Sequence, residues 1–351
     1  MINAGSASVP DAADPVASAA HAQVVQMAVG HVIAQAMYAL AELGIPDLLK
    51  DGPRTADEVA LETRMHAHAT FRLLRDSAGL GFFVETADRR FGLTPLGAAL
   101  RSDAPAHGRS LVRALVGPLG WGALGESLHS VKTGEAAMQK AFGQSLFDYL
   151  SGAPEVATQF NEMMIAFHGT EPAAVAAAYK FSGVQTLVDV GGGTGNLLTT
   201  ILEANPMLRG VLYDLPHVGA EARALIAKKG LSERCAVVEG SFFESVPSGG
   251  DVYMMSHVIH DWDEASCVRA LQHCRNAMHS RGRLLLVEMV IPPGSDFHPS
   301  KVLDLVMLTF TPGGQERTEG EYATLLGKAG LKLTRVVPTA SPVSVIEAEP
   351  V

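Results

Sequence analysis

The stretch Thr186-Leu-Val-Asp-Val-Gly-Gly-Gly-Thr-Gly195 decides the fold of this 351-residue chain. A short apolar, β-branched run ends in an aspartate and then breaks into a glycine-rich turn. Residues 196–204 follow with the apolar periodicity of a helix. This strand–loop–helix order is typical of an α/β ligand site, because glycines let backbone N–H groups approach a ligand closely. A tight turn that binds nothing would contain the same glycines.

The spacing of the glycines selects among ligands. A dinucleotide site needs a further glycine three residues after Gly193, where this chain has Asn196, and a phosphate loop needs a lysine that does not follow here. The pattern is instead D-x-G-x-G-x-G, from Asp189 through Gly191, Gly193 and Gly195. An acidic residue at the strand tip repels a pyrophosphate and suits a ligand that carries a cationic amino group.

Composition limits the classes of protein to consider. Hydrophobic residues make up 47% of the chain and charged residues 18%, which is enough for a sizeable core and, at this length, two domains. The formal net charge of −10 disfavours a nucleic-acid partner. We expect that no apolar run reaches the length of a membrane span and that the protein makes no membrane contact. Cys235, Cys267 and Cys274 lack C-x-x-C spacing, and we expect buried or half-buried thiols in a cytoplasmic protein.

The second half alternates strand and helix patterns, which predicts a mostly parallel sheet with helices on both faces. The expected strands are 186–190, 210–214, 235–240, 252–257, 283–289, 331–337 and 343–348, and the expected helices are 196–204, 217–229, 264–279 and 318–329. The last helix begins with the capping-box spacing of Thr318 and Glu321. The short linker between the last two strands predicts a hairpin and hence an antiparallel edge.

The first half has a different pattern. Residues 21–43 predict one long apolar helix. A helix capped by Thr55, an arginine-rich helix over 66–79, and a hairpin of 82–85 with 90–93 together form a winged-helix pattern. Such a module can read DNA, but the acidic charge of the chain favours a structural or dimerising role.

These patterns predict the domain organisation. Residues 1–18 lack the basic start and hydrophobic block of a signal peptide, so we expect a disordered tail. A winged-helix-like dimerisation domain over 19–105 and a helical connector over 106–180 precede an α/β domain over 181–351.

Residues after the second and third strands suggest an adenosine site. Asp214 ends the second strand, where an acid can accept hydrogen bonds from both hydroxyls of a ribose, and Leu215 follows it. Ser241 and Phe242 follow the third strand, where an adenine ring would lie, although Phe242 could equally fill the core. Together with Asp189 and the glycines, these residues describe an adenosine with a charged amino-acid end, which points to S-adenosylmethionine.

A histidine stands near this site, in His257-Val-Ile-His260-Asp261-Trp262 after the fourth strand. With an ordinary pKa of about 6.5, an imidazole is mostly unprotonated at neutral pH and can take a proton. Glu288 ends the fifth strand and Glu316 lies in a later loop. A carboxylate that accepts from one ring nitrogen fixes the tautomer and leaves the other nitrogen to accept a proton. A histidine held by carboxylates beside a methyl donor suits methylation of a hydroxyl, although a lone histidine is usually structural.

Four motifs in this order, 188–195, 214–217, 260–262 and 313–318, resemble the caffeic-acid and acetylserotonin (hydroxyindole) type of small-molecule O-methyltransferase. The resemblance covers nearly the whole chain, since that family carries an N-terminal winged-helix dimerisation domain. It implies an α/β fold with a Rossmann-like seven-stranded methyltransferase sheet whose last strand is antiparallel. It also implies S-adenosyl-L-methionine as methyl donor, S-adenosyl-L-homocysteine as product, a homodimer, no metal, and in-line displacement with His260 as general base supported by Glu288 and Glu316.

The same resemblance assigns further site residues. Those for the cofactor are Asp189, Gly191, Gly193, Gly195, Asp214, Leu215, Ser241, Phe242, Ser256 and Asp261, and those for the acceptor are Met164, Trp262, Met307 and Thr311. The chain departs from plant members at Ser241, where they usually have aspartate, at Ser256, where they have lysine, and at Thr311, where asparagine is common. It is therefore more similar to bacterial members that modify aromatic secondary metabolites, and we expect a small aromatic acceptor with a phenolic hydroxyl.

Three alternatives stay open. A nicotinamide oxidoreductase would use the same α/β frame, but it needs the missing glycine. A winged-helix regulator would sense a ligand with its C-terminal half. A family member with altered chemistry would hydroxylate, decarboxylate, or methylate nitrogen or carbon, although the intact His260 with both glutamates argues against loss of methyl transfer. We expect no metal site, although His257, His260 and Asp261 crowd together in the sequence.

Overall fold

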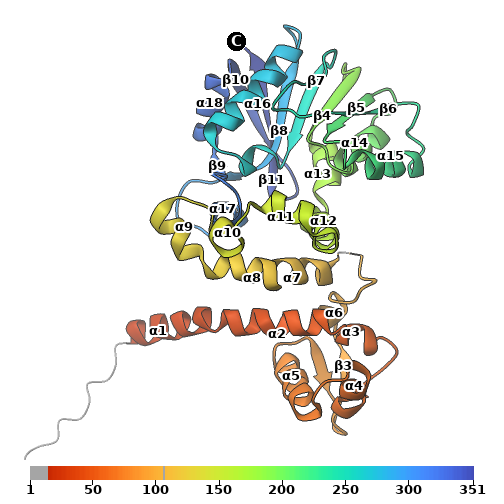
Figure 1. Ribbon diagram of the computed structural model, residues 1–351, viewed down its shortest axis with the longest axis vertical. Helices are drawn as coiled ribbons and strands as arrows, with labels where there is room; N and C mark the ends of the chain where they lie inside the picture. Colours follow the sequence, from red (N-terminus) through yellow and green to blue (C-terminus); the bar gives the residue numbers. More distant parts are fainter. Residues whose placement is uncertain (1–14, 106) are drawn as a thin grey trace, which may run out of the picture. The chain divides into compact units, whose positions relative to one another are not determined.

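The computed structural model describes residues 15–105 and 107–351 (Figure 1). They form two compact units. The first unit holds the residues up to Leu119 together with Gln159–Ala166, and the second holds Gly120–Thr158 together with Phe167–Val351. Residues 1–14, most of the expected tail, lie outside the described part of the chain. The domain boundaries drawn from the sequence stay a prediction.

The first unit has the expected winged-helix pattern. Its helices are α1 (Pro15–Ala28), α2 (Gly30–Glu42), α3 (Ile45–Leu48), α4 (Ala56–Thr63), α5 (Ala67–Gly79), α6 (Pro95–Ala98) and α7 (Gly108–Val116). A small sheet has the order β1 (Arg54–Thr55), β3 (Arg90–Leu93), β2 (Phe83–Glu85). Thr55 caps α4 in a capping box with Glu58, and the His66 side chain caps α5. The predicted cap at Thr55 and the predicted hairpin therefore form.

The long apolar helix is divided at Val29 into α1 and α2. Helical hydrogen bonds nevertheless run from Val29 N–H to the Val25 carbonyl (3.1 Å) and from Ile33 N–H to the Val29 carbonyl (3.3 Å). Among the described residues, one helical stretch, Ser18–Glu42, is long and apolar enough to cross a membrane by length and composition. The expectation that no apolar run reaches that length is therefore wrong.

The second unit contains the predicted parallel sheet. Its strands are β4 (Thr186–Val190), β5 (Arg209–Asp214), β6 (Cys235–Glu239), β7 (Val252–Ser256), β8 (Arg283–Ile291), β9 (Arg317–Thr318), β10 (Leu331–Pro338) and β11 (Val343–Pro350). Seven of them follow the order β10-β11-β8-β7-β4-β5-β6, while the short β9 pairs with the end of β8. The last strand, β11, is antiparallel to both neighbours, as the family resemblance implied.

One detail of the hairpin differs from the prediction. The antiparallel strand β11 is not at the edge, because it inserts between β8 and β10. The edge strand β10 therefore runs in the same direction as the parallel strands. The short linker determines the hairpin itself. Which of its two strands pairs with β8 depends on packing against the cores on the two faces of the sheet. Val345 and Ile346 of β11 are fully buried, one in each core.

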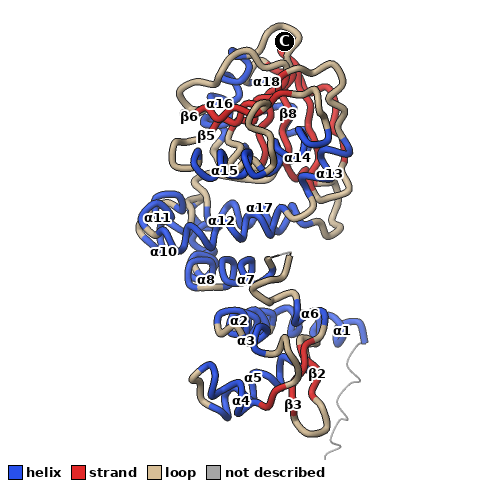
Figure 2. The backbone as a smooth tube through the Cα atoms, turned by 90° about the vertical axis from the view of Figure 1, so that its right-hand side faces the viewer, coloured by secondary structure: helices blue, strands red, loops and turns tan. Residues whose placement is uncertain are grey.

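Helices cover both faces of this sheet (Figure 2). They are α13 (Glu171–Ala178), α14 (Asn196–Ala204), α15 (Gly219–Lys228) and α17 (Pro299–Phe310) on one core, and α16 (Glu264–Ala277) and α18 (Glu319–Lys328) on the other. Successive strand residues point to opposite faces, so Leu187 lies in the first core and Val188 in the second. All three cysteines are buried thiols, as expected.

The expected connector consists of short helices. They are α8 (Pro118–Gly125), α9 (Ser127–Thr133), α10 (Ala137–Phe142), α11 (Leu146–Gly152) and α12 (Pro154–His168). Two of these helices end at glycines, because Gly134 and Gly143 take left-handed φ values of +75° and +74° and end α9 and α10.

Candidate active site

The glycine loop after β4 is bent by left-handed backbone conformations. Gly191, Gly193 and Gly195 have φ values of +73°, +56° and +84°, which side chains rarely tolerate. A Cβ on Gly191 would lie 2.8 Å from Val258 Cγ2, and one on Gly195 would lie 2.6 Å from Leu212 Cδ1. At Gly193 the structure has open space. The loop is thus closely packed at both ends and open at its middle glycine.

Two aspartates support this loop. Asp189 is buried beneath it, and its Oδ1 has no hydrogen-bond partner among the described residues. Burial and then the neighbouring Asp214 raise the pKa of Asp189 to about 7. Asp214 accepts hydrogen bonds from the N–H groups of Gly193 (2.7 Å) and Leu215 (2.6 Å). Each of its oxygens keeps a second lone pair for a hydroxyl. An unpartnered buried carboxyl beside open space fits a cofactor that brings a cationic or donor group.

The three residues expected to act on the acceptor lie together. His260 is in the short 3₁₀ helix η1 (Ile259–Asp261) after β7, and its side chain is buried. Its Nδ1 lies 2.8 Å from Glu316 Oε1 and 3.4 Å from Glu288 Oε2. Glu288 Oε1 also accepts from the backbone N–H groups of Val258 (3.2 Å) and Ile259 (3.0 Å). The Glu316 carboxylate therefore fixes a proton on Nδ1.

The protonation state of His260 differs from the sequence-based expectation. Burial lowers its pKa, but the carboxylates of Glu288, Asp261 and Glu316 raise it more strongly, to about 10. Its Nε2 lies 3.8 Å from Asp261 Oδ1, beyond hydrogen-bond distance. Burial also raises the pKa of Glu288 to about 7 and that of Asp261 to about 6. The carboxylates around His260 therefore favour the protonated imidazole, and only the neutral ring can act as a base.

Sequence reasoning missed two residues that hold the His260 loop. The buried Arg317 donates hydrogen bonds to the carbonyl oxygens of Ile259 (3.0 Å) and Trp262 (3.4 Å), on either side of the histidine. Asp304 of α17 accepts from the backbone N–H of Glu316 (2.9 Å). The sequence signals for Arg317 were its place within the 313–318 motif and its position directly after an assigned glutamate.

Aromatic side chains form a cluster near the expected adenine position. The ring centroid of Phe243 lies 4.6 Å from that of Phe242 and 4.8 Å from that of Trp262. Trp262 also stacks on Phe147 at 5.9 Å. Ser241 Oγ accepts from the N–H of Phe243 at 3.3 Å. Trp262, expected on the acceptor side, therefore belongs to the same cluster as Phe242, expected on the adenine side.

The remaining expected residues are more dispersed. Ser256 is the last residue of β7. Met307 is buried in the core on α17, and the Thr311 hydroxyl donates to its carbonyl at 2.8 Å, where that helix ends. This bond uses the hydrogen of the hydroxyl and leaves its lone pairs free, so the role of Thr311 at the acceptor stays a prediction. Met164 belongs to the Gln159–Ala166 segment of the first unit, so a pocket that it shares with Met307 stays a prediction.

Comparisons with known proteins give family matches over most of the chain. A family model described as an O-methyltransferase domain matches residues 121–332, and one described as an O-methyltransferase dimerisation domain matches residues 25–103. The phenazine O-methyltransferase of Lysobacter antibioticus is 42% identical, with 93% of this chain and 96% of that protein covered. The mitomycin biosynthesis 6-O-methyltransferase of Streptomyces lavendulae is 40% identical, with 90% of both covered. The solved structure of a mitomycin 7-O-methyltransferase has a TM-score of 0.91 at 38% identity and covers 96% of this chain and 99% of that one.

Proposed function

Because this chain belongs to the O-methyltransferase family, we propose that it transfers a methyl group from S-adenosylmethionine to a phenolic hydroxyl of a small aromatic molecule. The observation that carries this proposal is the buried 2.8 Å contact between His260 Nδ1 and Glu316 Oε1. This contact supports Nε2 as the nitrogen that accepts the proton of the acceptor. The phenazine enzyme among the relatives supports an aromatic acceptor. The family matches do not support a nicotinamide oxidoreductase or a DNA-binding regulator.

In this proposal the glycine loop and two aspartates hold the cofactor. S-Adenosylmethionine, when bound, supplies a methyl group on a positively charged sulfur. Asp214 binds the ribose hydroxyls with its remaining lone pairs, and the open space at Gly193 admits the amino-acid end. The carboxyl of Asp189, whose pKa is raised to about 7, is stabilised as an anion by a nearby cation. Phe242 and Trp262 line the adenine side of the cofactor site.

The His260 group moves the acceptor proton. The imidazolium, whose pKa is raised by three neighbouring carboxylates, must first give its Nε2 proton to solvent. A cation in the adjacent site favours this loss, because like charges repel. Nε2 then takes the phenolic proton as the oxygen attacks, and Glu316 stabilises the resulting imidazolium. A positioned base of this kind contributes about 10²–10⁴-fold to the rate.

The test is the variant His260→Ala. We expect kcat to fall by about 10²–10⁴-fold while cofactor affinity stays near that of the parent protein, because the base touches the acceptor and not the ribose. Mass spectrometry of phenols and polycyclic hydroxyaromatics, incubated with labelled cofactor, identifies the acceptor and measures turnover. Asp214→Ala is the matched variant, and it should weaken cofactor binding in calorimetry. Undiminished turnover by His260→Ala would remove this histidine from the mechanism.

We further infer that the protein acts as a homodimer in the cytoplasm. The dimerisation-domain match over residues 25–103 supports the dimer. The three buried thiols suit a reducing compartment. Exposed apolar side chains on α1 and α2, Val24, Met27 and Val32 among them, give a partner subunit a surface to cover.

A further inference from the structure

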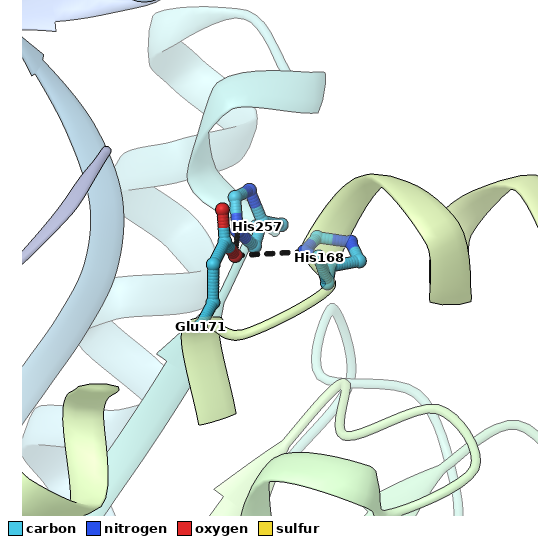
Figure 3. A group of neighbouring side chains, drawn as sticks. All are labelled: His168, Glu171 and His257. Atoms are coloured by element: carbon cyan, nitrogen blue, oxygen red, sulfur yellow. Dashed lines mark hydrogen bonds and ion pairs between the residues drawn. The ribbon is translucent and has the colours of Figure 1, made fainter. Parts of the chain in front are cut away.

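A second cluster of ionisable side chains lies beside the His260 group (Figure 3). His168 ends α12, Glu171 begins α13, and His257 directly follows β7. Glu171 Oε2 lies 2.8 Å from His257 Nε2 and 3.0 Å from His168 Nδ1. Figure 3 shows both imidazoles turned toward this single oxygen. Glu171 and His257 are buried, whereas the His168 side chain keeps 21% of its exposure.

The donor set is that of a transition-metal site. Two imidazole nitrogens and one carboxylate oxygen lie within 4.8 Å of one another. Zinc binds such ligands tetrahedrally at about 2.0–2.2 Å, which separates the ligand atoms by about 3.3 Å. The two separations from Glu171 Oε2, 2.8 and 3.0 Å, need to widen by a few tenths of an ångström, and the two imidazole nitrogens lie within 4.8 Å of each other. We propose that His168, Glu171 and His257 form a three-ligand site for a divalent metal ion of the zinc type, with solvent as the fourth ligand on the exposed side of His168.

The charges of the three groups suit a cation. Burial lowers the pKa of His257 to about 3, so its imidazole is neutral. Burial raises the pKa of Glu171, but hydrogen bonds from His168 and His257 outweigh it and lower the pKa to about 2. A metal ion needs neutral imidazoles and an ionised carboxylate.

The backbone gives a separate indication. His257 has φ of +52°, a left-handed conformation that is uncommon for a residue with a side chain. Such conformations persist where surrounding contacts determine them, and they gather at functional sites. A second possible set, His257 with His260 and Glu288, is less suitable, because His260 Nδ1 already bonds to Glu316.

The proposed ion joins two parts of the second unit. His168 and Glu171 belong to the α12–α13 junction, and His257 lies three residues before His260. The ring centroids of His257 and His260 are 5.2 Å apart. Metal binding would therefore fix the segment between β7 and the general base to α13. The inference concerns the metal alone and does not depend on the proposed acceptor.

The experiment uses the full chain, freed of any affinity tag and stripped with a chelator. Calorimetry with Zn²⁺ should show one tight site per chain, and Co²⁺ should give the visible absorption of a tetrahedral ion. His168→Ala and Glu171→Gln should weaken Zn²⁺ binding by at least about 10-fold. His257→Asn should do the same, and asparagine tolerates the left-handed backbone. His279→Ala is the control, because it removes an exposed histidine that lies 3.3 Å from Asp251.

The binding measurements either support the metal site or overturn it. Tight Zn²⁺ binding that is lost in His168→Ala and kept in His279→Ala supports the site, and His168 is decisive because its partly exposed side chain can be removed without opening the core. Absence of Zn²⁺ binding, or equal binding by the parent protein and His168→Ala, overturns the inference. In that case the cluster is a hydrogen-bonded support for the loop, and the proposed methyl transfer stands unaffected.

Discussion

The side chain of His260 shows how strongly neighbours decide the chemistry of one residue. An imidazole alone would be mostly neutral at pH 7, yet three carboxylates raise the pKa of this one to about 10. The sequence identified the histidine and both glutamates. His260 follows the fourth predicted strand, Glu288 ends the fifth, and Glu316 lies in a later loop. It did not identify Arg317, whose contacts are with backbone carbonyls far away in the chain.

Glu316→Gln tests this electrostatic effect. Removing one of the carboxylates should lower the pKa of His260, so the rise of methyl transfer with pH should move to lower pH. The maximal rate should fall by about 10-fold or more, since the imidazolium loses its hydrogen-bonded anion. The pH dependence of kcat measures both effects. Glu319→Gln removes an exposed charge nearby and should leave the profile in place; an unmoved midpoint in Glu316→Gln would contradict the assignment.

At the level of secondary-structure elements, the glycine loop after β4 shows how local backbone conformation shapes the site. Its three left-handed glycines were predictable in kind from the sequence, because such a turn after a strand needs residues without Cβ. The close approach of Val258 to Gly191 was not predictable, because it links β4 to the segment after β7. Likewise the hairpin of β10 and β11 followed from its linker, but the insertion of β11 beside β8 did not.

Gly191→Ala should destabilise the protein by about 1–2 kcal/mol or more, from the left-handed φ and the 2.8 Å contact with Val258, and weaken cofactor binding. Gly327→Ala is the matched control, because a Cβ there meets no atom within 4 Å and the residue lies in α18. It should raise stability by about 0.5–1 kcal/mol. Urea unfolding measures both changes. Equal stabilities for the two variants would show that the loop relaxes without cost.

At the scale of the whole molecule, the main feature is the exposed apolar surface of helices α1 and α2. The stretch Ser18–Glu42 is apolar enough for a membrane span, but only 11% of its most apolar window is buried within one chain. The dimerisation-domain match includes most of it. A second copy of the chain is therefore the expected partner for this surface.

Met27→Glu tests the dimer. A charge on this exposed methionine should shift the protein toward monomer, because an unpaired carboxylate is costly in an apolar interface. Light scattering after size exclusion, at micromolar concentration, measures the mass. Met207→Glu, at an even more exposed methionine of the other unit, should leave the dimer intact. A monomeric parent protein would contradict the proposal outright.

Elements whose causes are local could be predicted from the sequence. Short apolar runs predicted the strands, the caps at Thr55 and Thr318 predicted where helices start, and the spacing from Asp189 to Gly195 predicted the turn that opens the site. The insertion of β11, the high pKa of His260, and the contact of His257 with Glu171, which are 86 residues apart, arise only in the folded chain. The physical reason is range: backbone preference and hydrogen bonding to near neighbours act within a few residues, whereas burial and electrostatic interaction depend on groups that only the folded chain brings together.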